Sequence, residues 1–464
     1  MESETVILGA GLTGLTAAHR LHRLGRAVRV LEADPFIGGA SRTVRHGGFR
    51  FDLGGHRFYT RNQEVLDLVN ELLPGEVLSV ERLSRICLRG KFVDYPLSFF
   101  NALRALGPLT SAAVAASYAG ERLASLVRKR PDDTFENWVV SRFGRKLYEI
   151  YFRPYSEKVW GIPCKELGAD FAAQRIKGLS FREAVRNMLF RGSNGPATLA
   201  SRFLYPATGF GRIPEAMAAA LPQGSIHLSS PAVRLEHDGK RITSVVSRAD
   251  GREQRHTPNH VISTMPITEL LRLLSPAPPP EVMQAASALR YRDMVILFLT
   301  LNRRQVTPDH WIYFSTDDVF FGRLHEPKNW SAKMAPPEQT GLVVEVFCFE
   351  HEPVWAEPEE SLRARIAEKL EELKLIRRGE VAGSRLVRLR KAYPLYVPGY
   401  EERLRVILGW LGGFENLHVA GRNGLYFYTS GDYYIEMGLR AADNVMGVRH
   451  DLAMIGSAKE YAEK

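Results

Sequence analysis

The feature that most constrains the fold lies in the first 32 residues of the chain. A short apolar run at Thr5–Leu8 leads into the glycine turn Gly9–Gly14, with the sequence GAGLTG. Apolar residues then recur at helical spacing over Leu15–Leu24, and a second apolar run, Ala27–Leu31, ends at Glu32. This order of strand, glycine turn, helix, strand and acid predicts a βαβ unit that binds a dinucleotide.

Each glycine of this turn has its own task. Gly9 allows a tight turn, Gly11 lets the backbone approach a pyrophosphate, and Gly14 lets the helix pack closely on the strand. The free N–H groups and the positive dipole end of the helix suit phosphates. Glu32 stands where a carboxylate accepts a hydrogen bond from a ribose hydroxyl. We predict that these four residues bind the cofactor.

Two glycine pairs follow the βαβ unit. The first is Gly38–Gly39, within a segment that ends at Arg42, and the second is Gly54–Gly55, directly before His56. Glycine is needed where backbone approaches a flat ring without a Cβ in the way. These segments resemble the second and third glycine motifs of the amine oxidase and protoporphyrinogen oxidase superfamily of flavoproteins. The resemblance implies FAD, with these loops beside its pyrophosphate and isoalloxazine ring.

Later segments extend the resemblance. Pro231–Val233 resembles the strand whose backbone meets the adenine, and Val261–Pro266 resembles the strand that returns to the dinucleotide-binding domain. Val419–Arg422 resembles the segment that closes over the pyrophosphate. The residues that the resemblance adds to the predicted FAD site are Val233, Gly421, Arg422 and Gly438.

The whole chain predicts an α/β protein with inserted segments. Its 464 residues, 45% of them hydrophobic, exceed one ordinary core. We predict a discontinuous Rossmann-type FAD-binding domain, a mainly helical insertion with a substrate-site segment, and an α+β substrate domain. The predicted boundaries are 1–90, 221–270 and 411–464 for the FAD-binding domain, 91–220 for the insertion and 271–410 for the substrate domain.

Several elements of the later chain have clear signals. Thr134 is a plausible helix start. Val295–Leu301 and Gly341–Cys348 are apolar enough for buried strands. The segments Glu359–Leu373 and Asp432–Met446 have the periodicity of helices.

Four segments narrow the resemblance to the UDP-galactopyranose mutases. They are Gly54–Thr60, Lys146–Gly161, Trp311–Tyr313 with Arg323, and Gly421–Tyr428. The resemblance implies an isomerase that interconverts the pyranose and furanose forms of a nucleotide diphosphate sugar such as UDP-galactose, with N5 of reduced FAD as the nucleophile. In such a reaction the departing diphosphate requires cations, and guanidinium groups suit phosphate oxygens.

The same resemblance assigns residue roles. Arg175 and Arg323 would bind the diphosphate, and His56 would hold the loop beside the flavin; these three are the candidate catalytic residues. Arg422 would serve the cofactor side. The candidate substrate-binding residues are Tyr95, Tyr155, Trp160, Trp311, Tyr313, Tyr393 and Tyr428.

The sequence departs from the mutases at several places. Arg57 follows the loop histidine, where the mutases usually carry an uncharged residue, and Ser156 stands where the eukaryotic mutases have Asn. The run Ala392–Tyr400 also resembles a turn of the protoporphyrinogen oxidases. The sugar and the nucleotide stay open. The alternative is an FAD-dependent oxidase or desaturase of a porphyrinogen, amine or polyene, and a third hypothesis is a flavin-binding scaffold without activity.

The net charge and the cysteine content indicate which partners and which cellular compartment to expect. The net charge of +10 suits an anionic partner or simply a basic enzyme; the basic residues are scattered, and we predict no nucleic-acid binding. Three distant cysteines predict no metal site and a reducing, cytoplasmic location, in keeping with a start that has no signal peptide. The stretch Leu106–Gly120 is too short to span a bilayer, although peripheral membrane contact and the oligomeric state stay open.

Overall fold

The computed structural model describes residues 4–88, 90–95, 106–127, 130–169 and 202–456. Its first layer is a five-stranded parallel sheet in the order β20-β13-β1-β2-β9. The strands are β1 (Thr5–Leu8), β2 (Val28–Leu31), β9 (Ile226–His227), β13 (His260–Ser263) and β20 (Leu417–Val419). Segments from the beginning, middle and end of the chain therefore share one sheet, and the prediction of an α/β fold is confirmed.

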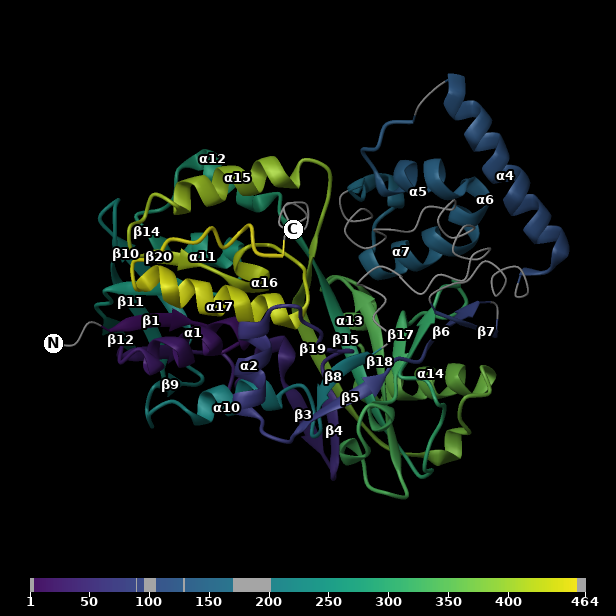
Figure 1. Ribbon diagram of the computed structural model, residues 1–464, viewed down its shortest axis with the longest axis horizontal. Helices are drawn as coiled ribbons and strands as arrows, with labels where there is room; N and C mark the ends of the chain where they lie inside the picture. The colour runs from purple at the N-terminus through teal and green to yellow at the C-terminus, as the bar shows by residue number, and fades with distance from the viewer. Residues whose placement is uncertain (1–3, 89, 96–105, 128–129, 170–201, 457–464) are drawn as a thin grey trace.

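Helices from both ends of the chain cover this sheet. α1 (Leu12–Arg23) packs along α17 (Gly431–Val445), and α10 (Arg212–Ala219) also contacts α1. The strands before and after α1, β1 and β2, are buried because they lie inside the parallel sheet and helices cover its faces. Figure 1 shows the purple and yellow ends of the chain side by side around this sheet.

A second, seven-stranded mixed sheet forms the other half. In this sheet β15 (Arg290–Leu301) pairs antiparallel with β18 (Thr340–Cys348) on one side and with the edge strand β19 (Val381–Leu395) on the other. The two predicted buried strands are confirmed as β15 and β18, each with longer bounds than predicted. They are buried because each has a neighbouring strand on both sides. The strands in order are β19 (Val381–Leu395), β15 (Arg290–Leu301), β18 (Thr340–Cys348), β17 (Arg323–His325), β16 (Trp311–Phe314), β6 (Ser84–Leu88) and β7 (Lys91–Asp94).

A helical group stands apart from the parallel sheet, with α4 at its outer edge (Figure 1). Its elements are α4 (Pro108–Val127), α5 (Phe135–Phe143), α6 (Arg145–Leu147), a π-helical turn (Tyr148–Phe152) and α7 (Arg153–Trp160). Thr134 caps α5 as predicted, since its hydroxyl accepts from the Asn137 N–H at 3.3 Å. Among the helices that the structure describes, none is long and apolar enough to cross a membrane. α4 leaves Leu109 87% and Val127 93% exposed.

The segment predicted as mainly helical also contains strands. β7 pairs with β6 across a turn at Gly90, and β8 (Arg202–Pro206) pairs antiparallel with β5 (Val77–Glu81). The expectation of helix does not hold for these two strands, because each is fixed by a partner outside the predicted insertion. Between Pro108 and Trp160 the described residues form the helices α4 to α7, joined by short loops and the π-helical turn.

The remaining elements complete the two halves. A four-stranded sheet contains β10 (Ala232–His237), β11 (Ile242–Ala249), β12 (Arg252–His256) and β14 (Leu274–Ser275). The predicted helix after residue 358 is confirmed as α14 (Glu359–Glu372). The other elements of four or more residues are β3 (Thr43–His46), β4 (Phe49–Asp52), α2 (Gln63–Leu72), α11 (Ile267–Leu273), α12 (Pro280–Ser287), α13 (Pro353–Ala356), α15 (Tyr400–Leu411) and α16 (Gly421–Gly424).

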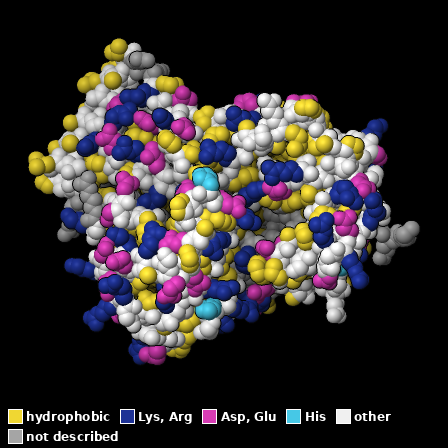
Figure 2. Space-filling model, turned by 180° about the vertical axis from the view of Figure 1, so that it is seen from behind, with side chains coloured by type: hydrophobic (Ala, Val, Ile, Leu, Met, Phe, Trp, Pro, Cys, Tyr) yellow, Lys and Arg dark blue, Asp and Glu magenta, His cyan; other side chains and the backbone are white. Residues whose placement is uncertain are grey.

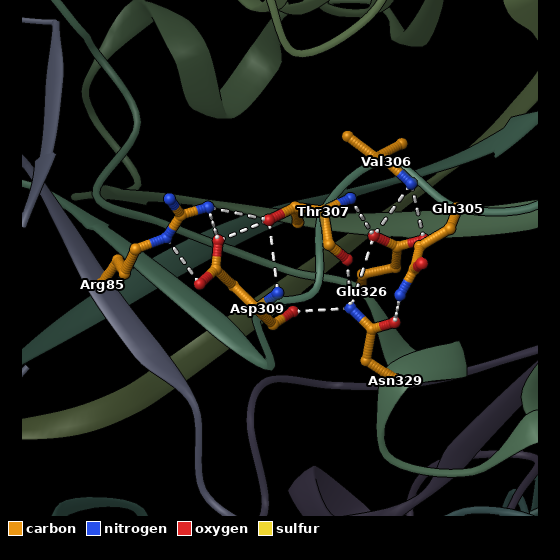
Figure 3. Close-up of polar contacts among 7 residues, drawn as sticks. All are labelled: Arg85, Gln305, Val306, Thr307, Asp309, Glu326 and Asn329. Carbon is orange, nitrogen blue, oxygen red and sulfur yellow. Dashed lines mark hydrogen bonds and ion pairs between the residues drawn. The ribbon is translucent and has the colours of Figure 1, made fainter. Parts of the chain in front are cut away.

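A buried polar network fixes the loops that lead into β16 and out of β17 (Figure 3). Arg85 of β6 donates to both carboxylate oxygens of Asp309, at 2.7 and 2.5 Å. Glu326 accepts from the N–H groups of Val306 and Thr307, both at 3.0 Å, and from the Thr340 hydroxyl at 2.6 Å. Glu326 is fully buried, and burial raises the pKa of its carboxyl group. The network therefore sets the positions of two strands that carry candidate site residues.

Replacing Glu326 by Ala should lower the free energy of unfolding by about 3 kcal/mol, because buried donors would lose their acceptor. The measurement is urea unfolding at neutral pH. Arg304→Ala is the control: Arg304 and Glu338 form an exposed ion pair, with side chains 77% and 70% accessible, and its loss should cost less than about 1 kcal/mol. Equal effects of the two substitutions would contradict a structural role for the network.

Candidate flavin and substrate site

The glycine turn after β1 has the geometry of a cofactor cradle. Gly9 has φ +105°, and a Cβ there would lie 2.5 Å from the Thr264 hydroxyl oxygen. A Cβ on Gly14 would lie 2.1 Å from the Gly9 carbonyl oxygen, so close packing of α1 requires glycine at this position. A Cβ on Gly11, in contrast, would meet no described atom within 4 Å. Packing therefore explains Gly9 and Gly14, whereas close approach of a ligand would explain Gly11.

Glu32 and the first glycine pair hold this turn from two sides. The Ala10 N–H donates to the Glu32 carboxylate at 2.7 Å, and the Ala10 carbonyl accepts from the Gly38 N–H at 2.8 Å. Gly38 has φ +95°, and Arg42 donates to the Gly39 carbonyl at 3.2 Å. Burial raises the pKa of the Glu32 carboxyl group. The two glycine segments thus form one surface around the start of α1.

The N-terminus of α1 opens onto this surface. Gly11 supplies no side-chain cap, and the first turn of the helix contains no acidic residue. Its unpaired N–H groups and positive dipole end therefore suit an anion such as a pyrophosphate.

The Gly54–Gly55 loop brings the parallel-sheet half against the mixed sheet. A Cβ on Gly55 would lie 2.2 Å from an indole carbon of Trp311. His56 stacks on Phe210 with ring centroids 5.1 Å apart. Its Nε2 is buried and has no hydrogen-bond partner among the described residues. A glycine loop with an unpartnered ring nitrogen fits the place of a flavin ring, as the sequence predicts.

His56 is neutral at physiological pH. Burial lowers its pKa to about 4, and the charge of Arg422 acts in the same direction. Since the ordinary pKa of histidine is about 6.5, the folded protein keeps this ring unprotonated where the unfolded chain would take up a proton.

The C-terminal segment closes over the start of α1. A Cβ on Gly421 would lie 3.1 Å from the Thr13 hydroxyl oxygen, and one on Gly438 would lie 2.5 Å from the Thr13 carbonyl oxygen. Arg422 donates to the Tyr434 hydroxyl at 3.1 Å and to the Ala392 carbonyl at 3.0 Å. Gly421 and Gly438 therefore act through packing on α1, and Arg422 joins this segment to β19.

Val233, the predicted adenine contact, lies at an irregularity of β10. The register with β11 shifts between Ala232 and Arg234, on either side of this residue. Such a bulge leaves a backbone group outside the strand ladder. This geometry suits the backbone contact that the sequence predicts.

Arg323 occupies the centre of the second part of the site. Strand register aligns Tyr313 with Arg323 and Arg323 with Glu345 across β16, β17 and β18. The Arg323 guanidinium lies 2.6 Å from the Glu345 carboxylate and donates to the Tyr393 hydroxyl at 2.7 Å. Burial alone would lower the pKa of Arg323, but the charge of Glu345, together with the neighbouring Tyr393 and Tyr155, outweighs burial and raises this pKa above its usual range. Arg323 therefore stays positively charged, and its contacts with Glu345 and Tyr393 hold it in one position.

All seven predicted substrate-binding aromatic residues lie around this arginine. Arg323 stands over the rings of Trp311 and Tyr393, 5.4 and 5.9 Å from their centroids. The remaining members are reached through ring contacts of 4.8 to 6.0 Å: Tyr95, Tyr155 and Trp311 contact Tyr313, and Trp160 and Tyr428 contact Tyr393. Arg175, the other predicted diphosphate ligand, lies outside the described residues.

The structure adds Glu345 and His325, which the sequence analysis did not include. Both are buried, and burial lowers the pKa of His325 to about 3. Nδ1 of His325 lies 3.8 Å from the Glu345 carboxylate. The signal for Glu345 was present: it is the one charged residue in the apolar run Thr340–Cys348.

Figure 2 shows basic and acidic side chains interleaved over the face it presents. The arginines that matter here are those buried among aromatic rings.

These features define a dinucleotide-binding α/β protein with a cationic, aromatic site next to the cofactor cradle. Residues 12–446 match the family of flavin-containing amine oxidoreductases, and the chain belongs to this family. It is therefore a flavoenzyme of that superfamily.

Three relatives illustrate the range of the family. The chain is 24% identical over 216 residues to a probable UDP-galactopyranose mutase of Klebsiella pneumoniae, covering 46% of this chain and 52% of that protein. It is 24% identical over 451 residues to a coproporphyrinogen III oxidase of Propionibacterium freudenreichii, covering 87% and 83%. A crystal structure of reduced UDP-galactopyranose mutase superposes with a TM-score of 0.87, at 22% identity, over 100% of this chain and 99% of that one. The match to the Klebsiella mutase thus spans about half of that relative, and the superposition shows the shared fold.

Replacing Gly55 by Ala should reduce the amount of flavin that co-purifies, because the new methyl group would collide with the Trp311 indole and displace the loop. The measurement is the flavin-to-protein absorbance ratio, with thermal stability recorded alongside. Gly379→Ala is the matched control, since a Cβ there meets no described atom within 4 Å. A normal flavin content in the Gly55 variant would show that this close approach does not shape the cradle.

The depressed pKa of His56 predicts a pH-dependent stability. Below pH 6.5 the unfolded chain protonates this residue and the folded protein does not, so stability falls as pH drops toward about 4. Between pH 6.5 and 5 this residue should account for a loss of about 2 kcal/mol. Chemical unfolding at both pH values measures it: His56→Gln should flatten the loss, whereas the exposed control His46→Gln should not. An unchanged slope in the His56 variant would mean that the ring titrates normally.

Proposed function

We propose that the protein is an FAD-dependent mutase that interconverts the pyranose and furanose forms of a nucleotide diphosphate sugar. The observation that carries this proposal is Arg323, a buried guanidinium held by Glu345 and Tyr393 among seven aromatic residues and next to the Gly54–His56 loop. The likeness to a reduced UDP-galactopyranose mutase over the full chain supports it. We expect an anionic small-molecule substrate of the UDP-galactose type.

The chain offers each part of FAD a binding group. The start of α1, with Gly11 and the Gly38–Gly39 segment around it, would take the pyrophosphate. Glu32 would accept from the ribose, and Val233 would meet the adenine through its backbone. The Gly54–His56 loop would lie beside the isoalloxazine ring. When bound in its reduced form, FAD would supply a nucleophilic N5 toward the anomeric carbon of the sugar.

Arg323 would bind the diphosphate and stabilise its negative charge as the bond to the sugar breaks. A preorganised cation in a water-poor site is more effective than one in bulk solvent, because it needs no reorganisation. Glu345 fixes the guanidinium but leaves other N–H groups: Nε is buried and has no hydrogen-bond partner among the described residues. The Tyr393 hydroxyl, which already accepts from Arg323, can donate its own proton to a phosphate oxygen.

The surrounding residues would position the sugar and exclude water. Tyr155 and Tyr313 have pKa values raised by burial, so their hydroxyls stay protonated and can donate hydrogen bonds. Trp160 and Trp311 supply apolar surface against sugar and base. Neutral His56 would fix the loop by hydrogen bonding rather than by charge.

An oxidase is the second candidate, because the coproporphyrinogen III oxidase relative matches 87% of this chain. An enzyme of that kind passes substrate electrons to oxygen or a quinone and releases an oxidised product at each turnover. Steady, substrate-dependent peroxide formation would favour it. The proposed mutase needs reducing equivalents only once, to prime the flavin.

The proposal predicts product only from the reduced protein. Dithionite-reduced enzyme should convert UDP-galactopyranose into a furanose under exclusion of oxygen, as detected by anion-exchange chromatography, and the oxidised enzyme should not. UDP binding without turnover would point to another sugar. Absence of both would sink the mutase proposal.

Arg323→Ala should weaken UDP binding to the holoenzyme by about 1.5–3 kcal/mol, because charge-assisted hydrogen bonds are lost. Since this change also leaves Glu345 buried without its partner, Tyr393→Phe provides a milder test that keeps the ring and removes one hydroxyl. It should weaken binding by about 1 kcal/mol. Titration of flavin absorbance with UDP measures both, with Arg304→Ala as the surface control. Unchanged UDP affinity in both site variants would remove Arg323 from the diphosphate site.

A further inference from the structure

Arg57 is a partly buried cation that has no carboxylate beside it in the described structure. It follows His56 in the loop between β4 and α2, and its guanidinium carbon lies over the Trp311 ring, 5.6 Å from the centroid. No hydrogen bond or ion pair links it to a carboxylate of the described residues. Burial lowers the pKa of Arg57, and the positive charge of Arg82 lowers it further.

The groups that face Arg57 are phenols and another cation. Tyr313, Tyr95 and Tyr428 lie within electrostatic range, together with Arg82. Tyr313 stacks on Trp311 with centroids 5.6 Å apart and lies 5.2 Å from Tyr95. Arg57 therefore lines the same aromatic enclosure that holds Arg323.

The nearby carboxylate cannot serve both arginines. Glu345 forms its 2.6 Å ion pair with Arg323, and its other neighbours are His325 and the Gly54–Gly55 loop. Placing a cation away from water without a counter-charge is costly. Such an arrangement is expected where a ligand supplies the missing negative charge.

The position of Arg57 identifies which part of a ligand it would meet. It adjoins His56 and Gly55 in the loop assigned to the flavin ring, where the sugar must lie for its anomeric carbon to react. Arg57 and Arg323 also lie near the same indole ring, 5.6 and 5.4 Å from its centroid, so the distance between the two guanidinium groups does not exceed the length of a nucleotide diphosphate sugar. With Arg323 engaged by the diphosphate, Arg57 remains for an acidic group on the sugar.

We propose that Arg57 binds a carboxylate of the sugar, and that the substrate is therefore a nucleotide diphosphate uronic acid. The fork of N–H groups on a guanidinium matches a carboxylate with two parallel hydrogen bonds. This inference rests on the proposed function, which supplies the diphosphate sugar. It also accounts for a charged residue directly after the loop histidine.

Binding to the holoenzyme tests the inference. UDP-galacturonate and UDP-galactose are titrated separately, with flavin absorbance as the readout. The wild type should bind the acid about 10- to 100-fold more tightly than the neutral sugar. Arg57→Gln should abolish that preference, so that the acid and UDP-galactose bind with about equal affinity. Arg57→Lys should retain part of the preference, because it keeps the charge but loses the fork. The surface control Arg304→Gln should behave as wild type.

The outcomes separate this inference from the function on which it rests. Equal affinity for the two sugars in the wild type, unaltered by Arg57→Gln, would overturn the uronate assignment while UDP binding upheld the mutase site. If neither sugar nor UDP perturbed the flavin, the proposed function would fail first. Coproporphyrin III is the probe for that case: Arg57-dependent binding of this tetracarboxylate would assign Arg57 to a tetrapyrrole and overturn the nucleotide-sugar inference. If Arg57→Gln lost its flavin, the wild-type preference and Arg57→Lys would decide.

Discussion

The buried pair of Arg323 and Glu345 is the interaction on which the site depends. A guanidinium and a carboxylate cost several kcal/mol each to remove from water, so the pair persists only because its partners are held closely. Glu345 comes from β18, which is buried over its whole length, and Arg323 comes from the adjacent short strand β17. The ion pair is thus anchored through Glu345 on the fully buried strand β18. The arginine keeps N–H groups for a ligand while its position stays fixed.

The same constraint joins the two halves of the molecule. Trp311 lies next to both Arg323 and Gly55, and its contact with Gly55 leaves no room for a side chain on the loop. The cofactor loop and the mixed sheet are therefore packed on each other at the point where chemistry would occur. The network of Arg85, Asp309 and Glu326 holds the ends of β16 and β17 from behind.

Much of the cofactor half could be predicted from the sequence, because its constraints are local. Glycines at fixed spacing, a helix start and an acid after the second strand report backbone geometry directly, and the structure places Gly9, Gly14 and Glu32 accordingly. The mixed sheet was harder. The pairing of β6 with β16 joins residues more than two hundred positions apart, and no local signal announces it. Glu345 went unnoticed for a related reason: its partner lies on another strand, although a charge in an apolar strand already demands one.

Charge balance constrains the ligand more firmly than family membership does. Relatives of this chain include a mutase and an oxidase, so the fold alone selects neither chemistry. Arg57, Arg323 and Arg422 all point their charge into aromatic surroundings, and Glu345 offsets the charge of Arg323. These guanidinium groups cannot become neutral by losing a proton, because their pKa values lie far above physiological pH. A neutral polyene would leave Arg57 without a counter-charge, whereas a ligand with a negative charge beside it would stabilise this residue. This charge balance supports the proposal of a nucleotide diphosphate sugar, whose phosphates would meet Arg323.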